Sequence, residues 1–327
     1  GSNNAAFGNY ALDANTTGGS NTAVGRGALS ANTTASYNTA VGYAALLSNT
    51  TAINNTAVGY NALYQNTTGA GNVALGVEAL KENTTASNCT AVGYLALKLN
   101  TTADGNTAVG RAALGSNTTG ANNTSVGDYA LQANTTGTRN TAVGKQALED
   151  PSTANDNTAV GYQALKANTT GVQNVAVGSY ALDSNTTGGN NIGIGYDTLQ
   201  VNTTGEHNVA IGSYALDANT DGDSNVAISV HALGANTTGS NNVAVGQDSS
   251  RLNTTGSHNV SIGYNTLNAN TTGTRNTGVG AYALDGNTTA NDNVAFGYAA
   301  LTAANTGTNN CAFGANSLQT NTSGHSN

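Results

Sequence analysis

The sequence of 327 residues has no methionine and no tryptophan, and it contains one proline, two cysteines and three phenylalanines. Only 8% of the residues are charged, which excludes a disordered chain held open by charge repulsion. No apolar run approaches the roughly 20 residues that a membrane-spanning helix needs, and no signal peptide is recognisable. The sequence therefore predicts no membrane insertion of this segment.

The few charges are mostly acidic, with 9 Lys and Arg against 17 Asp and Glu and a net charge of −8. A nucleic-acid binder needs clustered Lys and Arg to contact phosphates, so no nucleic-acid partner is expected. The sequence also lacks a polybasic face for anionic lipid. The two cysteines, Cys89 and Cys311, lie many repeats apart in the pattern described next, and we do not expect a disulfide between them.

The most prominent feature of the sequence is a regular repeat. A pattern of 17 residues begins at Asn4 and returns without insertion or deletion until Ser326, which gives 19 units. The stretch Asn157–Gln173, NTAVGYQALKANTTGVQ, shows one unit in full. A fixed short period is typical of stacked repeats, so residues 1–327 are predicted to form one repeat array. Because the pattern is already under way at residue 1, we expect the array to be a segment of a longer chain.

Aligning the units on one another shows which positions are restricted. Position one is Asn except at Cys89, position three is a small residue, position four is Val, Ile, Leu or Phe, and position five is Gly except at Ser229. Positions eight and nine are mostly Ala-Leu, and positions twelve to fifteen are mostly Asn-Thr-Thr-Gly or Asn-Thr-Thr-Ala. None of these columns carries a charge, apart from the second Thr. Burial of a charge is unfavourable, so we expect these columns to point inward or into tight turns.

Each unit predicts a strand, a bend, a short strand and a turn. Thr/Val-Ala-Val is a β-branched run, the following Gly marks a bend, and Ala-Leu is a second short apolar segment. Asn-Thr-Thr-Gly has turn chemistry, and together with the Gly at position five it excludes a helical repeat. The predicted fold is an all-β, rod-shaped parallel β-solenoid with one 17-residue coil per unit and like residues stacked at about 4.8 Å.

Both faces of the predicted strand lack charge, and this bears on association. Positions two and four form one face, and positions one, three and five form the other. One face can fill the coil while the other packs on a neighbouring chain, which predicts self-association as a homotrimer or a filament. The alternative is a self-sufficient single chain whose small residues let the walls of the coil approach closely.

Two segments of the array resemble a known family. The segments Asn174–Leu182 (NVAVGSYAL) and Asn208–Leu216 (NVAIGSYAL) resemble the head repeats of YadA-like trimeric autotransporter adhesins. Arrays of NTAVGYxAL followed by NTTG are similar to phage tail-fibre-like and bacterial surface proteins. The resemblance covers nearly the whole chain and implies a left-handed β-roll built by three chains, located outside the cell, on the cell surface or in a virion fibre.

The Asn-Thr-Thr triplets spell N-glycosylation acceptors. Further acceptors by spelling are Asn54, Asn88, Asn122, Asn123 and Asn259. The alternative role is structural, with Asn side chains that stack and bond the turn backbone, and this alternative is favoured because Asn219 persists although Asp221 removes its triplet. The candidate acceptors, called the turn asparagines below, are Asn15, Asn32, Asn49, Asn66, Asn83, Asn100, Asn117, Asn134, Asn168, Asn185, Asn202, Asn236, Asn253, Asn270, Asn287 and Asn321.

Tyrosine recurs at position six, where charges are also found, so these rings are expected to be exposed. They form a candidate contact surface for sugars or a partner, against the alternative that they shield the bend. Threonines at positions thirteen and fourteen suggest an ice-binding ladder, but adjacent residues point to opposite sides. The position-six tyrosines are Tyr43, Tyr60, Tyr94, Tyr162, Tyr196, Tyr264 and Tyr298.

Two units are irregular. Asp150-Pro151 replaces the usual turn at a point where no loss of a ladder donor is expected. The segment 247–252 lacks the Ala-Leu pair, and Leu252 is expected to swing inward and refill the core.

Catalysis has little support in the sequence. The four histidines, His207, His231, His258 and His325, lie in variable columns without paired carboxylates, and no Cys/His spacing suits a metal. We therefore expect no enzyme activity, no cofactor and no metal site. The predicted function is a structural component of an extracellular fibre or filament, either a surface adhesin or a tail-fibre-like shaft. The alternative is a carbohydrate- or ice-binding solenoid that uses its Tyr or Thr ladders.

Overall fold

The computed structural model describes residues 1–151, 153–303 and 306–327. The described chain is all-β, without a helix, and forms a parallel β-solenoid with about 17 residues per turn, as the repeat predicted. It divides into two compact units, Gly1–Gln163 and Ala164–Asn327. Each unit is built on the same plan, and each is described by itself.

Every coil contributes one strand of three residues, from positions two to four. In the first unit these are β1 Ala5–Phe7, β2 Thr22–Val24, β3 Thr39–Val41, β4 Thr56–Val58, β5 Val73–Leu75, β6 Thr90–Val92, β7 Thr107–Val109, β8 Thr124–Val126, β9 Thr141–Val143 and β10 Thr158–Val160. In the second unit they are β11 Val175–Val177, β12 Ile192–Ile194, β13 Val209–Ile211, β14 Val226–Ile228, β15 Val243–Val245, β16 Val260–Ile262, β17 Thr277–Val279, β18 Val294–Phe296 and β19 Cys311–Phe313.

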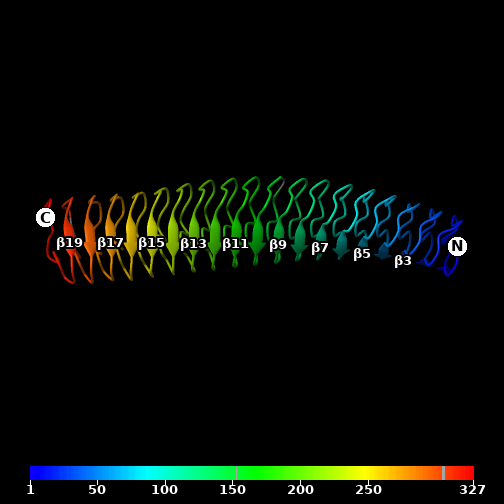
Figure 1. Ribbon diagram of the computed structural model, residues 1–327, viewed down its shortest axis with the longest axis horizontal. Helices are drawn as coiled ribbons and strands as arrows, with labels where there is room; N and C mark the ends of the chain where they lie inside the picture. Colours follow the sequence, from blue (N-terminus) through cyan, green and yellow to red (C-terminus); the bar gives the residue numbers. More distant parts are fainter. Residues whose placement is uncertain (152, 304–305) are drawn as a thin grey trace. The chain divides into compact units, whose positions relative to one another are not determined.

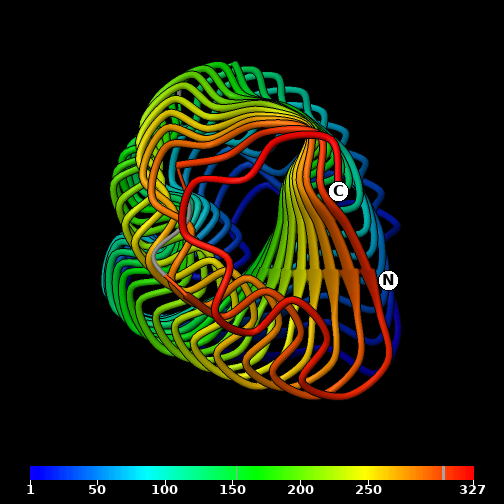
Figure 2. The same cartoon turned by 90° about the vertical axis from the view of Figure 1, so that its left-hand side faces the viewer.

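Within each unit, consecutive strands pair in parallel and in register (Figure 1). Thr39 lies beside Thr56, and Val41 beside Val58, so equivalent positions of successive units form straight rows. Seen from one end, the strands lie along one wall of the coil and the turns form the remaining walls (Figure 2). Both units are thus organised by the stacking of equivalent residues in successive coils.

The strand buries its middle residue and turns the other two outward. Ala57 has no exposed surface, whereas Val58 on the same strand is 38% exposed. The expectation that position four points inward is therefore wrong. The interior is so narrow that only Ala, Ser or Gly fits at position three, and strand alternation sends both neighbouring side chains to the outside.

The Ala-Leu segment is buried, but it is a turn and not the second strand that the sequence suggested. Its backbone visits the left-handed region at positions seven and nine, with φ of 53° at Ala44 and 51° at Leu29. This alternation sends the N–H of Ala44 to Arg26 O in the preceding coil at 2.9 Å and the N–H of Leu29 to Ala45 O in the following coil at 3.1 Å. The strained turn is stabilised because its backbone forms hydrogen bonds to both neighbouring coils.

The coil at 247–252 replaces the buried Ala-Leu pair with Ser249 and Ser250. Both hydroxyls donate to the hydroxyl of Ser261 in the next coil, at 2.7 and 2.8 Å. Leu252 is 46% exposed, so the expectation that it refills the core is wrong. Three small hydroxyl groups satisfy one another in the narrow interior, and no larger apolar side chain is required.

Candidate functional site

The outward side of the strands is the first candidate surface, and we call it the strand face: the side chains at positions two and four of each strand. Most of its position-four side chains are about one-third exposed, as are Val177 at 36% and Ile262 at 41%, and Phe7 and Phe313 are 77% and 67% exposed. No residue of β1–β19 is charged. Isolated exposed apolar residues are ordinary on protein surfaces, but an unbroken charge-free row of them is typical of an interaction surface.

The strand face differs in chemistry between the two units. In the first unit, position two is Thr in every strand from β2 to β10 except β5, which has Val73. In the second unit, position two is Val or Ile except at Thr277 and Cys311. The first unit therefore presents alternating hydroxyl and aliphatic rows, and the second presents two aliphatic rows. Treating Thr and Val as interchangeable in one column hid this difference from the sequence analysis.

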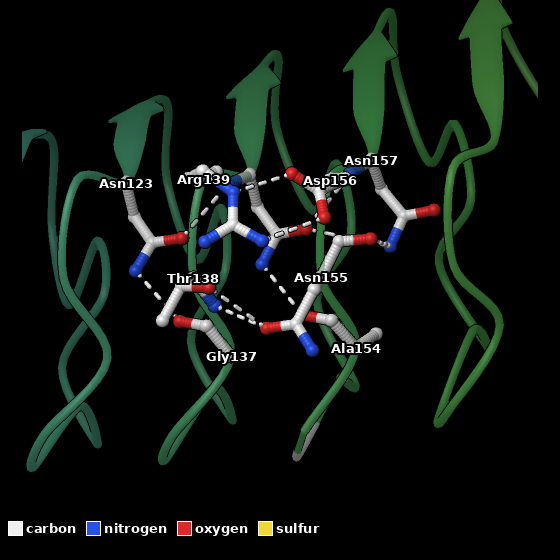
Figure 3. A network of polar contacts seen from close by, with 9 residues as sticks. Asn123, Gly137, Thr138, Arg139, Ala154, Asn155, Asp156 and Asn157 are labelled. Atoms are coloured by element: carbon white, nitrogen blue, oxygen red, sulfur yellow. Dashed lines mark hydrogen bonds and ion pairs between the residues drawn. The ribbon is translucent and has the colours of Figure 1, made fainter.

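Asparagines at position one form a ladder inside each unit. The Oδ1 of Asn123 accepts the backbone N–H of Asn140 at 2.9 Å, and its Nδ2 donates to Gly137 O at 2.8 Å (Figure 3). Asn140 then repeats the first contact with Asn157 at 3.0 Å. Each amide thus bonds the turn of its own coil and the backbone of the next, which explains why the column tolerates almost nothing but Asn.

The turn asparagines form a second ladder. The Nδ2 of Asn66 donates to Gly69 O and to Asn49 Oδ1, both at 2.9 Å. All turn asparagines except Asn15 and Asn321 are buried. An N-linked sugar would be attached to the nitrogen that makes these bonds. Burial and bonding therefore favour the structural role of these residues, and whether any of them carries a glycan stays a prediction.

This second ladder is interrupted at Pro151. The Oδ1 of Asn134 has no hydrogen-bond partner among the described residues, because proline stands one period later in place of asparagine. Proline also removes a backbone donor, since the N–H at this position bonds the Leu carbonyl three residues earlier, as Asn134 does with Leu131 at 3.2 Å. This bond lies within one coil, so Pro151 removes a donor of the turn but none from the backbone ladder between coils, as the sequence predicted. At Ala304 the sequence also lacks the Asn, and this position lies outside the described residues.

The two threonines of each turn, at positions thirteen and fourteen, have different roles. The hydroxyl at position thirteen bonds along the ladder, as Thr67 Oγ1 does to Thr84 O at 3.0 Å. The hydroxyl at position fourteen lies on an exposed residue such as Thr68. The position-thirteen row is half-buried in most coils and exposed in others, such as at Thr169 and Thr288, so the position-fourteen row is the more exposed of the two.

The position-six tyrosines are exposed, as their column predicted, from 38% at Tyr162 to 58% at Tyr298. Tyr43 and Tyr60 stack with ring centroids 5.3 Å apart, and Arg26 Nη1 donates to the Tyr43 hydroxyl at 2.9 Å. Two open grooves of about 310 and 400 Å³ share Tyr43 and Leu47 and are bordered by Asp13, Arg26, Tyr64, Gln65 and Glu82. Both hollows have an aromatic wall.

Some charged side chains pair along the columns, and others pair within a coil, as Lys81 does with Glu78. Arg139 and Asp156, one coil apart, form two parallel bonds of 2.6 and 2.8 Å (Figure 3), and Arg275 and Asp292 repeat the arrangement in the second unit. The hydrogen bond from Arg139 lowers the pKa of Asp156. Such exposed pairs add little stability, so they satisfy the charged columns without forming a reactive centre.

The described residues hold no group of three or more His, Cys, Asp and Glu placed to bind a metal ion. They also hold no helix that is long and apolar enough to cross a membrane. Comparison with protein-family models and with curated proteins found no match for this chain. The surfaces described above are therefore the basis for its functional interpretation.

Proposed function

We propose that this chain is a structural component of an extracellular fibre, whose copies pack side by side through their strand faces and display the turns and tyrosines outward. The observation that carries the proposal is the charge-free strand face, which keeps about one-third of most position-four side chains exposed in both units. Charged residues occur in the neighbouring columns, so their absence from this face is not a consequence of composition alone.

The free energy of association favours a contact that runs along a whole unit. Burying the exposed third of a Val or Ile contributes about 0.5–1 kcal/mol, so the nine strands of the second unit contribute roughly 5–9 kcal/mol. Association itself costs about 4–15 kcal/mol in lost freedom. Burial along only a few coils is too weak to offset this cost. Burial along a whole unit gives a free energy within the range of the cost. In this proposal, the repetition of the strand face along the unit is what makes association favourable.

The experiment compares two double variants. Ile211→Lys with Ile228→Lys places two charges on the strand face of the second unit. Ser213→Lys with Val230→Lys places the same charges two residues further along the same coils, in a column where Lys145 occurs naturally. Native mass spectrometry and sedimentation should show assemblies for the wild type and the second double variant, and monomers for the first. A wild type that is monomeric at tens of micromolar, or equal behaviour of the two variants, contradicts the proposal.

A second candidate function is supported by the grooves beside Tyr43 and Tyr60. Aromatic faces next to groups that donate and accept hydrogen bonds, here Arg26, Gln65 and Glu82, suit a saccharide. A glycan array with the isolated chain tests this function: binding that is lost in Tyr60→Ala and kept in Tyr162→Ala supports it. Thermal hysteresis measured on the same sample tests the ice-binding alternative.

A further inference from the structure

Three asparagines outside the turn ladder combine a glycosylation triplet with an exposed position. Asn54, Asn88 and Asn122 occupy position seventeen of their units, directly before the position-one asparagine or Cys89. All three are exposed, and no hydrogen bond joins their side-chain amides to any other residue that the structure describes. They contrast with the turn asparagines, whose Nδ2 atoms are bonded, except that of Asn321, and mostly buried.

The backbone presents these side chains outward. The φ values of Asn54, Asn88 and Asn122 are 61°, 58° and 59°, in the left-handed region that asparagine tolerates better than most residues. The third residue of each triplet is Thr56, Thr90 or Thr124, on the strand face. Among the described residues none of these half-buried hydroxyls has a hydrogen-bond partner, so in the unassembled chain the exposed amide has an unbonded hydroxyl two residues later.

The coils between these asparagines leave room for a bulky group, whereas Tyr37 precedes Asn54 and Arg139 follows Asn122 in the same column. Along this column the sequence reads Asn54, Gly71, Asn88, Gly105, Asn122, so glycine alternates with asparagine. A side chain at Gly71 would meet Asn88 Oδ1, which shows how close successive coils lie. Asparagines in alternate coils are about 9.6 Å apart, which separates attached sugars that would collide on successive coils.

We propose that Asn54, Asn88 and Asn122 are the N-glycan acceptor sites of the folded chain, and that the turn asparagines are not. In the transfer, Nδ2 forms a bond to C1 of a sugar carried by a glycosyl-phosphate donor. The bond from C1 to the phosphate oxygen breaks, the phosphate leaves with the electron pair, and the amide loses one proton to the transferase. All three sites lie in the first unit, where position two carries the required Thr.

The chain contains its own controls. Asn190 and Asn241 are exposed at the same position with φ of 59° and 60°, but Ile192 and Val243 stand where the triplet needs a hydroxyl. Replacing Thr56, Thr90 or Thr124 by Val removes one site at a time, and Val73 shows that this column of the first unit accepts Val. Replacing Ile192 by Thr creates a fourth site in the second unit.

The test treats the purified folded chain with a soluble asparagine glycosyltransferase of Asn-x-Ser/Thr specificity and UDP-glucose. Intact mass and glycopeptide mapping should find hexose at Asn54, Asn88 and Asn122, one fewer in each Thr→Val variant, and one more, at Asn190, in Ile192→Thr. The urea-denatured chain, in which the turn asparagines are open, shows that the enzyme is active. A folded chain that takes no hexose while the denatured chain does, or one modified equally at Asn66, overturns the proposal.

Discussion

At the scale of single residues, asparagine carries most of the specificity of this array. The position-one Asn side chain accepts from the next coil and donates to its own turn, as Asn38 does to Ala52 O at 2.9 Å. Only a side chain with a donor and an acceptor at this length can do both. Each departure from Asn therefore leaves a defined backbone group without its partner, and such defects make direct tests of the ladder.

Cys89 is the departure at position one. Its Sγ replaces the amide donor, at 3.3 Å from Ala103 O, but it offers no oxygen to the backbone N–H of Asn106. We expect Cys89→Asn to restore this bond and raise the free energy of unfolding by about 1 kcal/mol at pH 7. Chemical denaturation measures the change, and Cys311→Ser at the exposed second cysteine is the control.

The same cysteine predicts a pH dependence. Burial raises the pKa of the Cys89 thiol from 9.0 to about 11. The unfolded chain therefore loses this proton first, and the wild type loses stability as pH rises from 9 to 11, by up to about 2.7 kcal/mol. The difference between Cys89→Asn and wild type should widen over this window in denaturation measured at pH 7, 9 and 10.5. A constant difference would contradict buried-thiol titration.

Pro151 gives the corresponding test at position twelve. Pro151→Asn should return a donor to Asn134 Oδ1 and should be more stable than Pro151→Ala by about 1–2 kcal/mol, because a buried acceptor regains its bond. The alanine variant separates this gain from the backbone effect of removing proline. Thermal melting of the three proteins measures both, and equal stability of the Asn and Ala variants would argue against a side-chain ladder.

At the scale of the coil, the tight bend after each strand depends on glycine. Gly59 has φ of 139°, and a Cβ there would collide with the carbonyl oxygen of Gly76 in the next coil. Ser229 is the natural exception, and its φ has shifted to 112°. The bend is thus limited by the approach of one coil to the next, not by the turn alone.

This bend predicts two opposite effects. Gly59→Ala should lower the free energy of unfolding by roughly 2–4 kcal/mol, through left-handed strain and the clash with the next coil. Ser229→Gly should raise it by about 1 kcal/mol, since strain already present is relieved. Urea denaturation of both variants measures these changes, and a neutral Gly59→Ala would show that neighbouring coils move apart freely.

At the scale of the molecule, each unit is a one-dimensional stack in which a coil touches only its neighbours. Local damage should therefore stay local. In Gly59→Ala, hydrogen exchange should quicken in peptides that cover residues 38–88 and remain as in the wild type over residues 123–160. Mass spectrometry of exchanged peptides measures this range, and uniform loss of protection would indicate a single cooperative unit.

Much of this molecule followed from its sequence. The strict period determined the parallel solenoid, because like residues can stack only if every coil has the same length, as the pairing of Thr39 with Thr56 shows. The columns without charge determined most of the buried positions, since Asn32, Ala28 and Leu29 have no exposed surface. These features are local and repeated, so one unit is enough to predict them.

Only the tertiary structure decided which restricted positions face outward. Val58 looked like a core residue, and its exposure follows from an interior filled by Ala57 and Leu63 with no room for a second β-branched row. The Ala-Leu turn, with its left-handed Leu, also depends on bonds to both neighbouring coils. The separation of buried turn asparagines from exposed Asn54, Asn88 and Asn122 has the same origin. Their triplets are spelled alike, and only the path of the coil determines which amides are accessible.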